Sequence, residues 1–463
     1  MPLPRSTPPR ELDLSGFESD FCFSRMLDNF VWRSFGAGWI ERAAAGRLGQ
    51  LPLKATRALS QVNFGRMERL APLSYKGHVE HSDCLGLLAR ELAEGGLRQG
   101  GSPRLLVPIL MLLTSAVFYP YRNWEAFLVA AQPGRRRLGS SDQWSDSIEM
   151  DRLAAKSHWS AMARIVYLCG PEAFQEGILP RVFECARATM IIPALYTRTR
   201  LFLDEARWMT TPWALGPASK PEQAKLLDIL TAVPGLLEDL KTIESLDHRK
   251  TSLEELDHHN VLKEALGGRI RTQIDALYRW RVAWQNRFAS SVALGTNGQA
   301  YSAMPGELLS RRLSFDSATR AVDISLYNAV LLWLLAILHK VDSDHAHIST
   351  ADRCCSRLTT SRRYCPPVSS IAPLRDYVLE ILLVLDWQSR HHPNAATQLA
   401  EPIYMYLVPS AMAMSMLDDD DPVQPWIRQM LDGHHVTAGY WDQRGYMRGF
   451  SRFVKREVVY RDA

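Results

Sequence analysis

The sequence has few cysteines, and none of them belongs to a paired motif. Its 463 residues contain seven cysteines and no CxxC pair, so neither a thioredoxin-like redox site nor a paired-cysteine zinc site is encoded locally. An odd number of cysteines without regular spacing is also unlike the disulfide framework of a small secreted domain, and it predicts that the protein resides in a reducing compartment. The seven are Cys22, Cys84, Cys169, Cys185, Cys354, Cys355 and Cys365.

Apolar runs long enough to cross a membrane are lacking as well. The two longest, Leu105–Phe118 and Ile324–Leu338, fall short of the roughly 20 residues that a bilayer requires, and we expect both to be buried helices. The N-terminal stretch MPLPRSTPPRELDL has proline and arginine where a secretory signal needs an apolar core. The sequence therefore predicts a soluble intracellular protein without a membrane partner.

The fingerprints of common enzyme classes are absent too. There is no GxxxxGK[ST] loop for phosphates, no GxGxxG after a strand, no HExxH zinc helix and no GxSxG nucleophile elbow. These absences argue against common kinases, dehydrogenases, zinc proteases and serine hydrolases, and we expect no cofactor. An enzyme whose residues converge only in the folded chain remains compatible with the sequence.

Strong charge of one sign is also missing. The chain has 54 lysines and arginines against 50 aspartates and glutamates, a formal net charge of +4, with an isoelectric point near 8.6. A nucleic-acid-binding domain usually has an isoelectric point above about 9 and clustered charge. Composition alone therefore does not predict binding to DNA or RNA.

Helical periodicity is the dominant positive signal. One apolar stripe recurs in steps of four and three residues, which places its members on one helix face, although Pro234 inside it predicts either a kinked helix or two helices that meet. Convincing two-residue alternation with hairpin turns is absent, so the sequence predicts an all-α fold, a large irregular multi-helix domain. The stripe consists of Leu226, Leu230, Val233, Leu237 and Leu240, and a second one of Ile270, Ile274, Leu277, Trp284 and Phe288.

Proline and glycine divide this helical chain into segments. We expect a disordered tail at 1–16, an N-terminal helical lobe at 17–131, an inserted loop at 132–160, and a helical core with a C-terminal lobe of the same domain at 161–463. The loop contains the polar run Gln132–Ser147, and its composition is typical of an exposed, protease-sensitive segment. Gly295–Gly306 and Asp342–Val368 are further loop-like stretches. No repeat of fixed period is visible, which argues against a regular solenoid.

Two features contain residue types that bind metals. The run Asp418, Asp419, Asp420 and Asp421 offers carboxylates that could hold magnesium and a diphosphate, as in all-α terpene cyclases, but no second motif of the Asn-Asp-x-x-Ser-x-x-x-Glu type accompanies it. Capping explains the run without a ligand, because Asp421 precedes Pro422 and proline is favoured at the first position of a helix. The adjacent pairs His258–His259, His391–His392 and His434–His435 point about 100° apart on a helix and rarely share one metal.

The segment Arg269–Arg287 mixes bases and aromatic residues, as a nucleic-acid-binding helix would. The candidate phosphate contacts are Arg269, Arg271, Arg279 and Arg281. The apolar stripe on the same segment favours a different interpretation, in which one face packs into the core and the arginines cover its edges.

A second aromatic concentration lies in ALYTRTRLFLDEARWMTTPW, which contains Tyr196, Phe202, Trp208 and Trp213. Aromatic density of this kind lines ligand pockets, and it also marks helix–helix interfaces in large cores. The sequence leaves both interpretations open.

The order of several segments resembles the regulatory region of fungal transcription factors of the binuclear zinc-cluster class. LDNFVWRSFGAGWIERAAAGRLGQLPLKATRALSQVNFGR (Leu27–Arg66) resembles its opening. LCGPEAFQEGILPRVFECARATMIIPALYTRTRLFLDEARWMTTPW (Leu168–Trp213) and LLDILTAVPGLLEDL (Leu226–Leu240) resemble its middle, and PLRDYVLEILLVLDWQSRHHP (Pro373–Pro393) its C-terminal part. The resemblance covers most of Leu27–Pro393, and it rests on the order in which these segments follow one another along the chain.

That resemblance implies an all-helical regulatory domain downstream of a small DNA-binding module. The module needs six thiolates for two zinc ions, and Cys22 is the sole cysteine among the first eighty residues. The zinc cluster therefore cannot be built from this sequence, and we expect no autonomous sequence-specific DNA binding. Gln132–Ser147 and Asp342–Cys365 also depart from the pattern, and the matched segments contain no catalytic or metal-binding residue.

By resemblance, the sequence predicts a nuclear transcriptional regulator, or a regulator-like paralogue, from a fungus. It would act through contacts with other transcriptional regulators or with itself, and through a small effector in its helical core, in a setting such as secondary-metabolite biosynthesis. The alternative is an all-α magnesium-dependent enzyme that acts on a prenyl diphosphate through Asp418–Asp421. A third alternative is a structural interaction scaffold.

Overall fold

A computed structural model describes eleven parts of the chain. They are residues 15–30, 37–93, 103–118, 159–215, 220–247, 253–296, 311–342, 374–391, 403–417, 421 and 423–432. Almost all of these residues are helical, which confirms the all-α, multi-helix prediction. Gln132–Ser147, where we expect an exposed loop, lies outside the described residues, as does most of Asp342–Val368.

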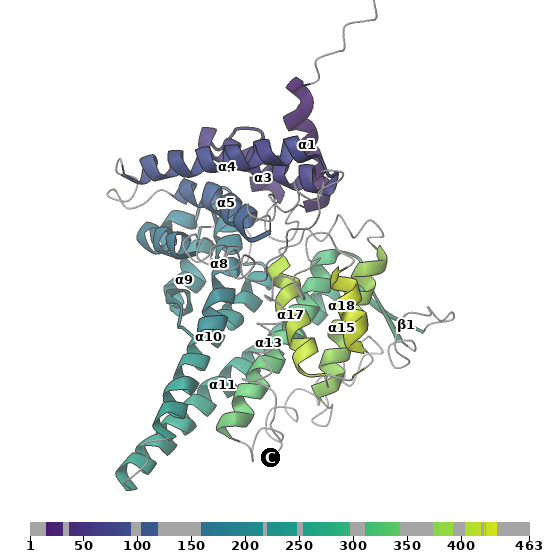
Figure 1. Cartoon of the computed structure of the whole chain (residues 1–463). Helices are drawn as coiled ribbons and strands as arrows, with labels where there is room; N and C mark the ends of the chain where they lie inside the picture. Colours follow the sequence, from purple (N-terminus) through teal and green to yellow (C-terminus); the bar gives the residue numbers. More distant parts are fainter. Residues whose placement is uncertain are drawn as a thin grey trace, which may run out of the picture.

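The N-terminal helices form a layer at one end of the molecule (Figure 1). The helices α3 and α4 pack against each other over much of their length. Gly77 of α4 makes this close approach feasible, because a Cβ atom at that position would lie 2.6 Å from Val62 Cγ2. The apolar helix α5 contacts α3, and its described side chains from Leu106 to Thr114 are buried, as expected from its composition. The layer comprises α1 (Ser15–Phe30), α2 (Ala37–Ala44), α3 (Gln50–Met67), α4 (Ala71–Glu91) and α5 (Leu106–Phe118).

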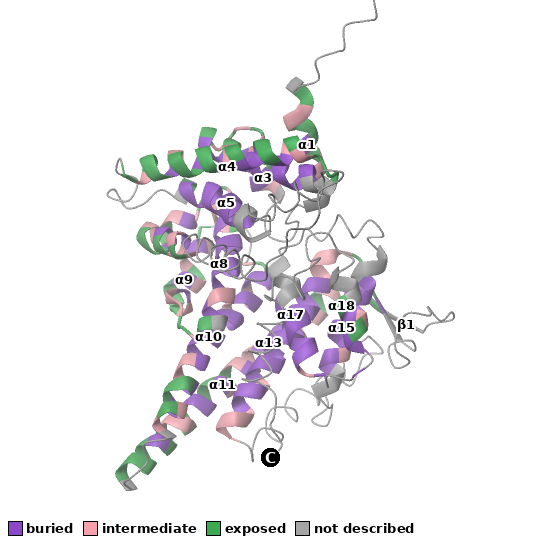
Figure 2. Cartoon of the chain, viewed as in Figure 1, coloured by how far each residue is buried: buried purple, intermediate pink, exposed green. Residues whose placement is uncertain are grey.

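The middle of the chain forms a second group of helices, dominated by a long helical pair. The helices α10 and α11 pack against each other, and their joined ends project from the body of the molecule, where most residues are exposed (Figures 1 and 2). The group comprises a helix at 159–169, α8 (Leu179–Thr197), α9 (Ala206–Thr210), α10 (Glu222–Asp247) and α11 (Leu253–Phe288). Short 3₁₀ turns at Pro171–Phe174, Phe202–Asp204 and Thr211–Trp213 connect them.

The apolar stripe of α10 is a core face. None of its five leucine and valine side chains is more than 3% exposed, because α10 packs against α8, α11 and α13. One helix runs through Pro234 without interruption, so the alternative of two helices that meet there is wrong. The second stripe behaves in the same way on α11, where Ile270, Ile274, Leu277 and Trp284 are buried and Phe288 is partly buried.

The C-terminal helices surround α13, the most apolar long helix. Every residue from Ala321 to Leu334 is buried, because α10, α11, α15 and α17 all pack on α13. Among the described residues, α13 is the one helix whose length and composition would suit a membrane span, but 94% of its apolar window is buried inside the fold. These elements are α13 (Ala318–Val341), α15 (Leu374–His391), α17 (Ile403–Ser415) and α18 (Val423–Asp432).

A two-stranded antiparallel sheet interrupts the helical pattern. The strand β1 (Val292–Thr296) pairs with β2 (Arg311–Phe315), so that Val292 lies opposite Phe315. The sequence predicts no strands and a loop-like stretch that begins at Gly295, and both predictions are wrong at these residues. The pairing is stabilised by burial of Leu313 and Phe315, and Phe315 makes an edge-on contact with Trp387 of α15 at 5.2 Å between ring centroids.

One hydrophobic core extends through the whole described chain. It runs from Phe23 in α1 to Ile427 in α18 without a break into separate clusters. The lobe predicted at 17–131 and the helices after residue 161 therefore share their core. The helix α1 begins at Ser15, within the tail predicted at 1–16, and a helix begins at residue 159, within the loop predicted at 132–160.

Candidate functional site

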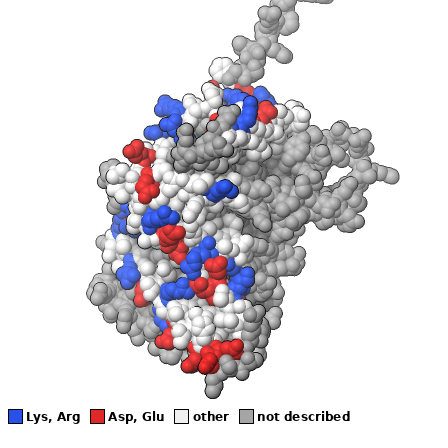
Figure 3. Space-filling model, turned by 90° about the vertical axis from the view of Figure 1, so that its left-hand side faces the viewer, with Lys and Arg blue, Asp and Glu red and all other residues white. Residues whose placement is uncertain are grey.

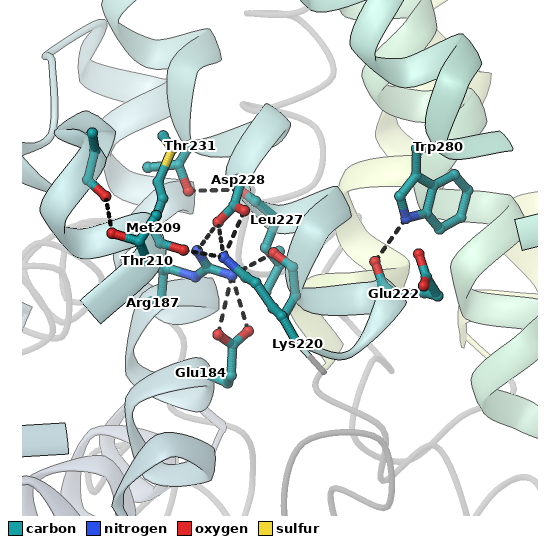
Figure 4. A network of polar contacts seen from close by, with 12 residues as sticks. Glu184, Arg187, Met209, Thr210, Lys220, Glu222, Leu227, Asp228, Thr231 and Trp280 are labelled. Carbon is teal, nitrogen blue, oxygen red and sulfur yellow. Dashed lines mark hydrogen bonds and ion pairs between the residues drawn. The ribbon is translucent and has the colours of Figure 1, made fainter. Parts of the chain in front are cut away.

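The densest group of buried charges lies where α8 meets α10 (Figure 4). Its centre is Arg187 of α8, whose side chain is fully buried. The Arg187 guanidinium donates to Asp228 Oδ1 of α10 at 2.5 Å, to Glu184 Oε2 at 3.1 Å, and to the carbonyl oxygen of Ala224 at 2.7 Å. A buried guanidinium needs such partners, because removal of a charge from water without them costs several kcal/mol.

Lys220 completes this network from the segment that leads into α10. Its ammonium group donates to both carboxylate oxygens of Asp228, at 2.7 and 2.6 Å, and to the carbonyl oxygen of Met209 at 2.6 Å. All three donors of the lysine are therefore used. The same nitrogen lies 3.8 Å from the ring centroid of Trp213, a distance suited to a cation–π contact.

The protein environment shifts the pKa values of Lys220 and Glu184, at the two ends of the network. Burial lowers the pKa of Lys220 to about 8, and repulsion from Arg187 adds to this effect while Asp228 opposes it. Burial raises the pKa of Glu184, although Arg187 favours its ionised form. Because two positive and two negative groups neutralise one another inside the fold, we call Glu184, Arg187, Lys220 and Asp228 the buried charge clamp.

A cluster of aromatic rings covers this clamp. Phe183 of α8 stacks on Phe174 at 5.0 Å and on Trp208 at 5.8 Å between ring centroids, and it meets Trp213 edge-on at 5.7 Å. Phe202 contacts the fully buried Trp208 at 5.0 Å. Of the aromatic residues singled out in the sequence, Phe202, Trp208 and Trp213 thus pack at a helix–helix interface. The arrangement favours the interface interpretation over an open ligand pocket.

The mixed basic and aromatic segment of α11 is divided between the core and the surface. Arg281 is almost completely buried and donates to Glu380 of α15 at 3.2 Å. Arg269 pairs with Asp239 of α10 at 2.5 Å, and Arg271 pairs with Asp342. Arg279 is exposed. The four candidate phosphate contacts therefore do not form a single basic surface, which supports the packing interpretation of this helix.

The exposed side of the α8, α10 and α11 group carries interspersed charges of both signs (Figure 3). Arg200 is the centre of this surface network and donates to Asp204 at 3.0 Å and to Asp239 at 2.6 Å. Arg269 joins it through Asp239. These contacts connect the end of α8 to α10 and α11, and they leave no large patch of one sign among the described residues in this view.

Of the four aspartates Asp418–Asp421, the structure describes one, Asp421. Asp421 is buried, and its Oδ1 atom accepts a hydrogen bond from the Val423 amide at 2.9 Å, while its carbonyl oxygen accepts from the Gln424 amide at 3.0 Å. This is the geometry of a helix cap, and the described part of α18 begins at Val423. Asp418, Asp419 and Asp420 lie outside the described residues.

The histidine pairs do not form a metal centre in the part of the chain that the structure describes. His258 is exposed and the adjacent His259 is buried, so the two point in different directions on α11. No group of three or more histidine, cysteine, aspartate or glutamate side chains there has a metal-binding arrangement. His434 and His435 lie outside the described residues.

The four residues of the buried charge clamp were not predicted from the sequence. A signal was present, because Glu184 and Arg187 are charged residues flanked by apolar ones in VFECARA, and Asp228 interrupts the run LLDIL. Charged side chains are rarely buried without partners, so such positions indicate a buried pair. The partners themselves could not be assigned, since Arg187 and Asp228 are 41 residues apart.

Comparisons of this chain with protein-family models, with curated proteins and with solved structures find no match.

Proposed function

We propose that this protein is a transcriptional regulator that acts through a helical regulatory domain. In this proposal it works in the nucleus, by contact with other regulators or with a second copy of itself. A small effector and a role in secondary-metabolite biosynthesis are part of the same proposal. The resemblance of its segments to the regulatory region of fungal zinc-cluster transcription factors is the starting point.

The observation that supports this proposal most directly is the packing of those segments. Leu168–Trp213 and Leu226–Leu240 are consecutive in the resemblance, and in the fold they meet along α8 and α10, joined by the buried charge clamp. The α15 helix, which lies in Pro373–Pro393, packs on α13 in the same core. Packing of these segments in one core is compatible with a single regulatory domain.

The arrangement of charge gives weaker support. Among the described arginines of α11, Arg269 and Arg271 pair with carboxylates from other parts of the chain and Arg281 is buried, whereas Arg279 is exposed. A domain of this kind suits contact with proteins rather than contact with phosphates, which requires unpaired basic side chains in a groove or along a stripe.

A reporter experiment tests the proposal. The full chain is fused to an unrelated DNA-binding domain with its own nuclear import signal, and expression of a reporter with the matching operator is measured in fungal cells. We expect activation or repression of several-fold relative to the DNA-binding domain alone. Arg187→Met serves as a comparison that disrupts the core, and Arg207→Ala as a matched surface variant that should keep the effect.

Two results would contradict the proposal. One is a fusion that is folded, abundant and bound at the operator, yet leaves expression unchanged in both directions. The other is magnesium-dependent release of diphosphate from a prenyl diphosphate by the purified chain, which would support the enzyme alternative. Localisation of the tagged chain without the added import signal tests the nuclear part of the proposal separately.

A further inference from the structure

Two tryptophans of α11 connect this helix to two different neighbours. Trp280 donates its indole N–H to the carbonyl oxygen of Glu222, at the start of α10, at 2.7 Å (Figure 4). Trp284, one turn later, donates to Asp323 Oδ2 of α13 at 2.9 Å. The two indoles stack at 6.2 Å between ring centroids. We call this meeting point of α10, α11 and α13 the tryptophan junction.

Asp323 has an uneven set of partners. It is fully buried, and its Oδ2 atom accepts from both Trp284 Nε1 and Arg320 Nη1, each at 2.9 Å. Its Oδ1 atom is buried and has no hydrogen-bond partner. A carboxylate has about four acceptor sites, so half of the group is desolvated without compensation, which disfavours its ionised form.

The charged and polar groups around Asp323 come from α13, α10, α11 and α15. Arg320 lies on its own helix and stacks on Phe288, at 3.5 Å from the ring centroid. From α10, Glu222 contributes a second buried carboxylate, held by Lys225 at 2.8 Å and Arg287 at 3.5 Å. From α11 comes the Trp284 indole. On α15, Glu380 is directed to Arg281 and Asn328.

We propose that Asp323 makes the tryptophan junction a proton-sensitive latch, in which uptake of one proton by the buried carboxylate removes the cost of a half-unpartnered charge where α13 meets α11 and so stabilises the fold. The unpartnered Oδ1 atom is the position for that proton, because Oδ2 already accepts two hydrogen bonds. The protonated acid removes a buried negative charge beside Glu222. This inference concerns the isolated chain and does not depend on the proposed function.

The direction of the effect follows from the titration of Asp323. Burial raises its pKa to about 6, with a further contribution from Glu222, although Trp284 and Arg320 favour the ionised form. An aspartate in the unfolded chain titrates near pH 3.9. Between about pH 4 and pH 6 the folded chain therefore binds a proton that the unfolded chain does not, so this group makes folding more favourable as the pH falls.

The indole N–H of Trp284 provides a direct readout. In protein with ¹⁵N-labelled tryptophan, we expect its resonance to shift with a midpoint near pH 6, and Trp284→Phe assigns the signal by its disappearance. Asp323→Asn should abolish the shift, because the side-chain amide does not titrate. Asp83→Asn, at an exposed position of α4, is the matched control and should leave the titration unchanged.

Chemical unfolding at several pH values gives the second readout. As the pH falls from about 6 to about 4, the unfolding equilibrium constant of the wild type should decrease by up to about tenfold per pH unit relative to that of Asp323→Asn. If Asp323→Asn fails to fold, Arg320→Gln keeps the carboxylate and should move the Trp284 midpoint above that of the wild type, because Arg320 lowers the pKa of Asp323. A Trp284 resonance that does not change between pH 5 and 7.5, or that shifts equally in Asp323→Asn, would overturn the latch.

Discussion

Arg187 of α8 and Asp228 of α10 form an ion pair of 2.5 Å at the edge of the core, with the arginine fully buried and the aspartate side chain 22% exposed. The same carboxylate also receives the Lys220 ammonium group. One aspartate thus neutralises two cations from different parts of the chain. This arrangement makes the relative position of α8 and α10 depend on charge pairing as well as on apolar contact.

Arg187→Met should destabilise the protein by about 3–5 kcal/mol, because Glu184 and Asp228 would lose a buried partner and keep their charges. Chemical unfolding followed by circular dichroism measures this change. Arg207→Ala is the matched control, since Arg207 is about half exposed and pairs with the equally exposed Glu205, and surface pairs contribute little. Equal effects of the two substitutions would show that the clamp does not stabilise the fold.

Leu237→Ala should cost about 2–5 kcal/mol through lost burial and the cavity that remains. Leu237 is fully buried within a single chain, so we expect no change in self-association by sedimentation. Val261→Ala, at a position that is 62% exposed on α11, should change stability by less than about 0.5 kcal/mol. A variant that melts like the wild type but associates differently would instead identify α10 as a dimer seam.

The described cysteines should react slowly with iodoacetamide in the native protein. Burial raises the pKa of Cys22, Cys84 and Cys169 to about 11, and that of Cys185 well above its ordinary value. The thiolate is the reactive form, so alkylation at pH 7.5 should be slow before urea is added and fast afterwards. Mass spectrometry of peptides separates these sites from Cys354, Cys355 and Cys365. Rapid native labelling of Cys185 would contradict the packing of α8.

Asp421→Ala should destabilise the protein by about 1 kcal/mol through loss of the cap on α18. Because the cap explains this residue without a ligand, magnesium chloride should not raise the melting temperature of the wild type beyond the effect of matched ionic strength. The measurement is a thermal melt with and without the salt. A magnesium-specific rise that disappears in Asp421→Ala would favour the diphosphate-binding alternative.

The isolated chain should not bind DNA with sequence specificity. Base readout needs an element in a groove together with phosphate contacts that hold its register, whereas Arg281 is buried and Arg269 and Arg271 are paired. Any residual binding should be weak and should fall steeply with salt. A gel-shift assay near physiological salt with random competitor DNA measures this. Competitor-resistant binding below about micromolar concentration to one sequence would direct attention to the exposed Arg279.

The helical character of the fold and the buried faces of its helices follow from the amino-acid sequence alone. The stripes of α10 and α11, the apolar helices α5 and α13, and the cap at Asp421 all follow from residue spacing over one or two turns, and local spacing is visible in a single chain. Local spacing left two interpretations of Pro234 open, because it does not show whether packing against neighbouring helices keeps one helix continuous through a proline.

Which charged side chains pair with each other depends on how the helices pack in the folded chain. Arg187 pairs with a residue 41 positions away, and Arg281 with Glu380 at a separation of 99 residues. The strands β1 and β2 likewise form through pairing across an intervening segment. Such contacts depend on how helices dock, and docking is set by the shape of the whole core rather than by any short pattern. Asp323 could not be recognised as a titrating group from the sequence, because its pKa is fixed by burial against α10 and α11.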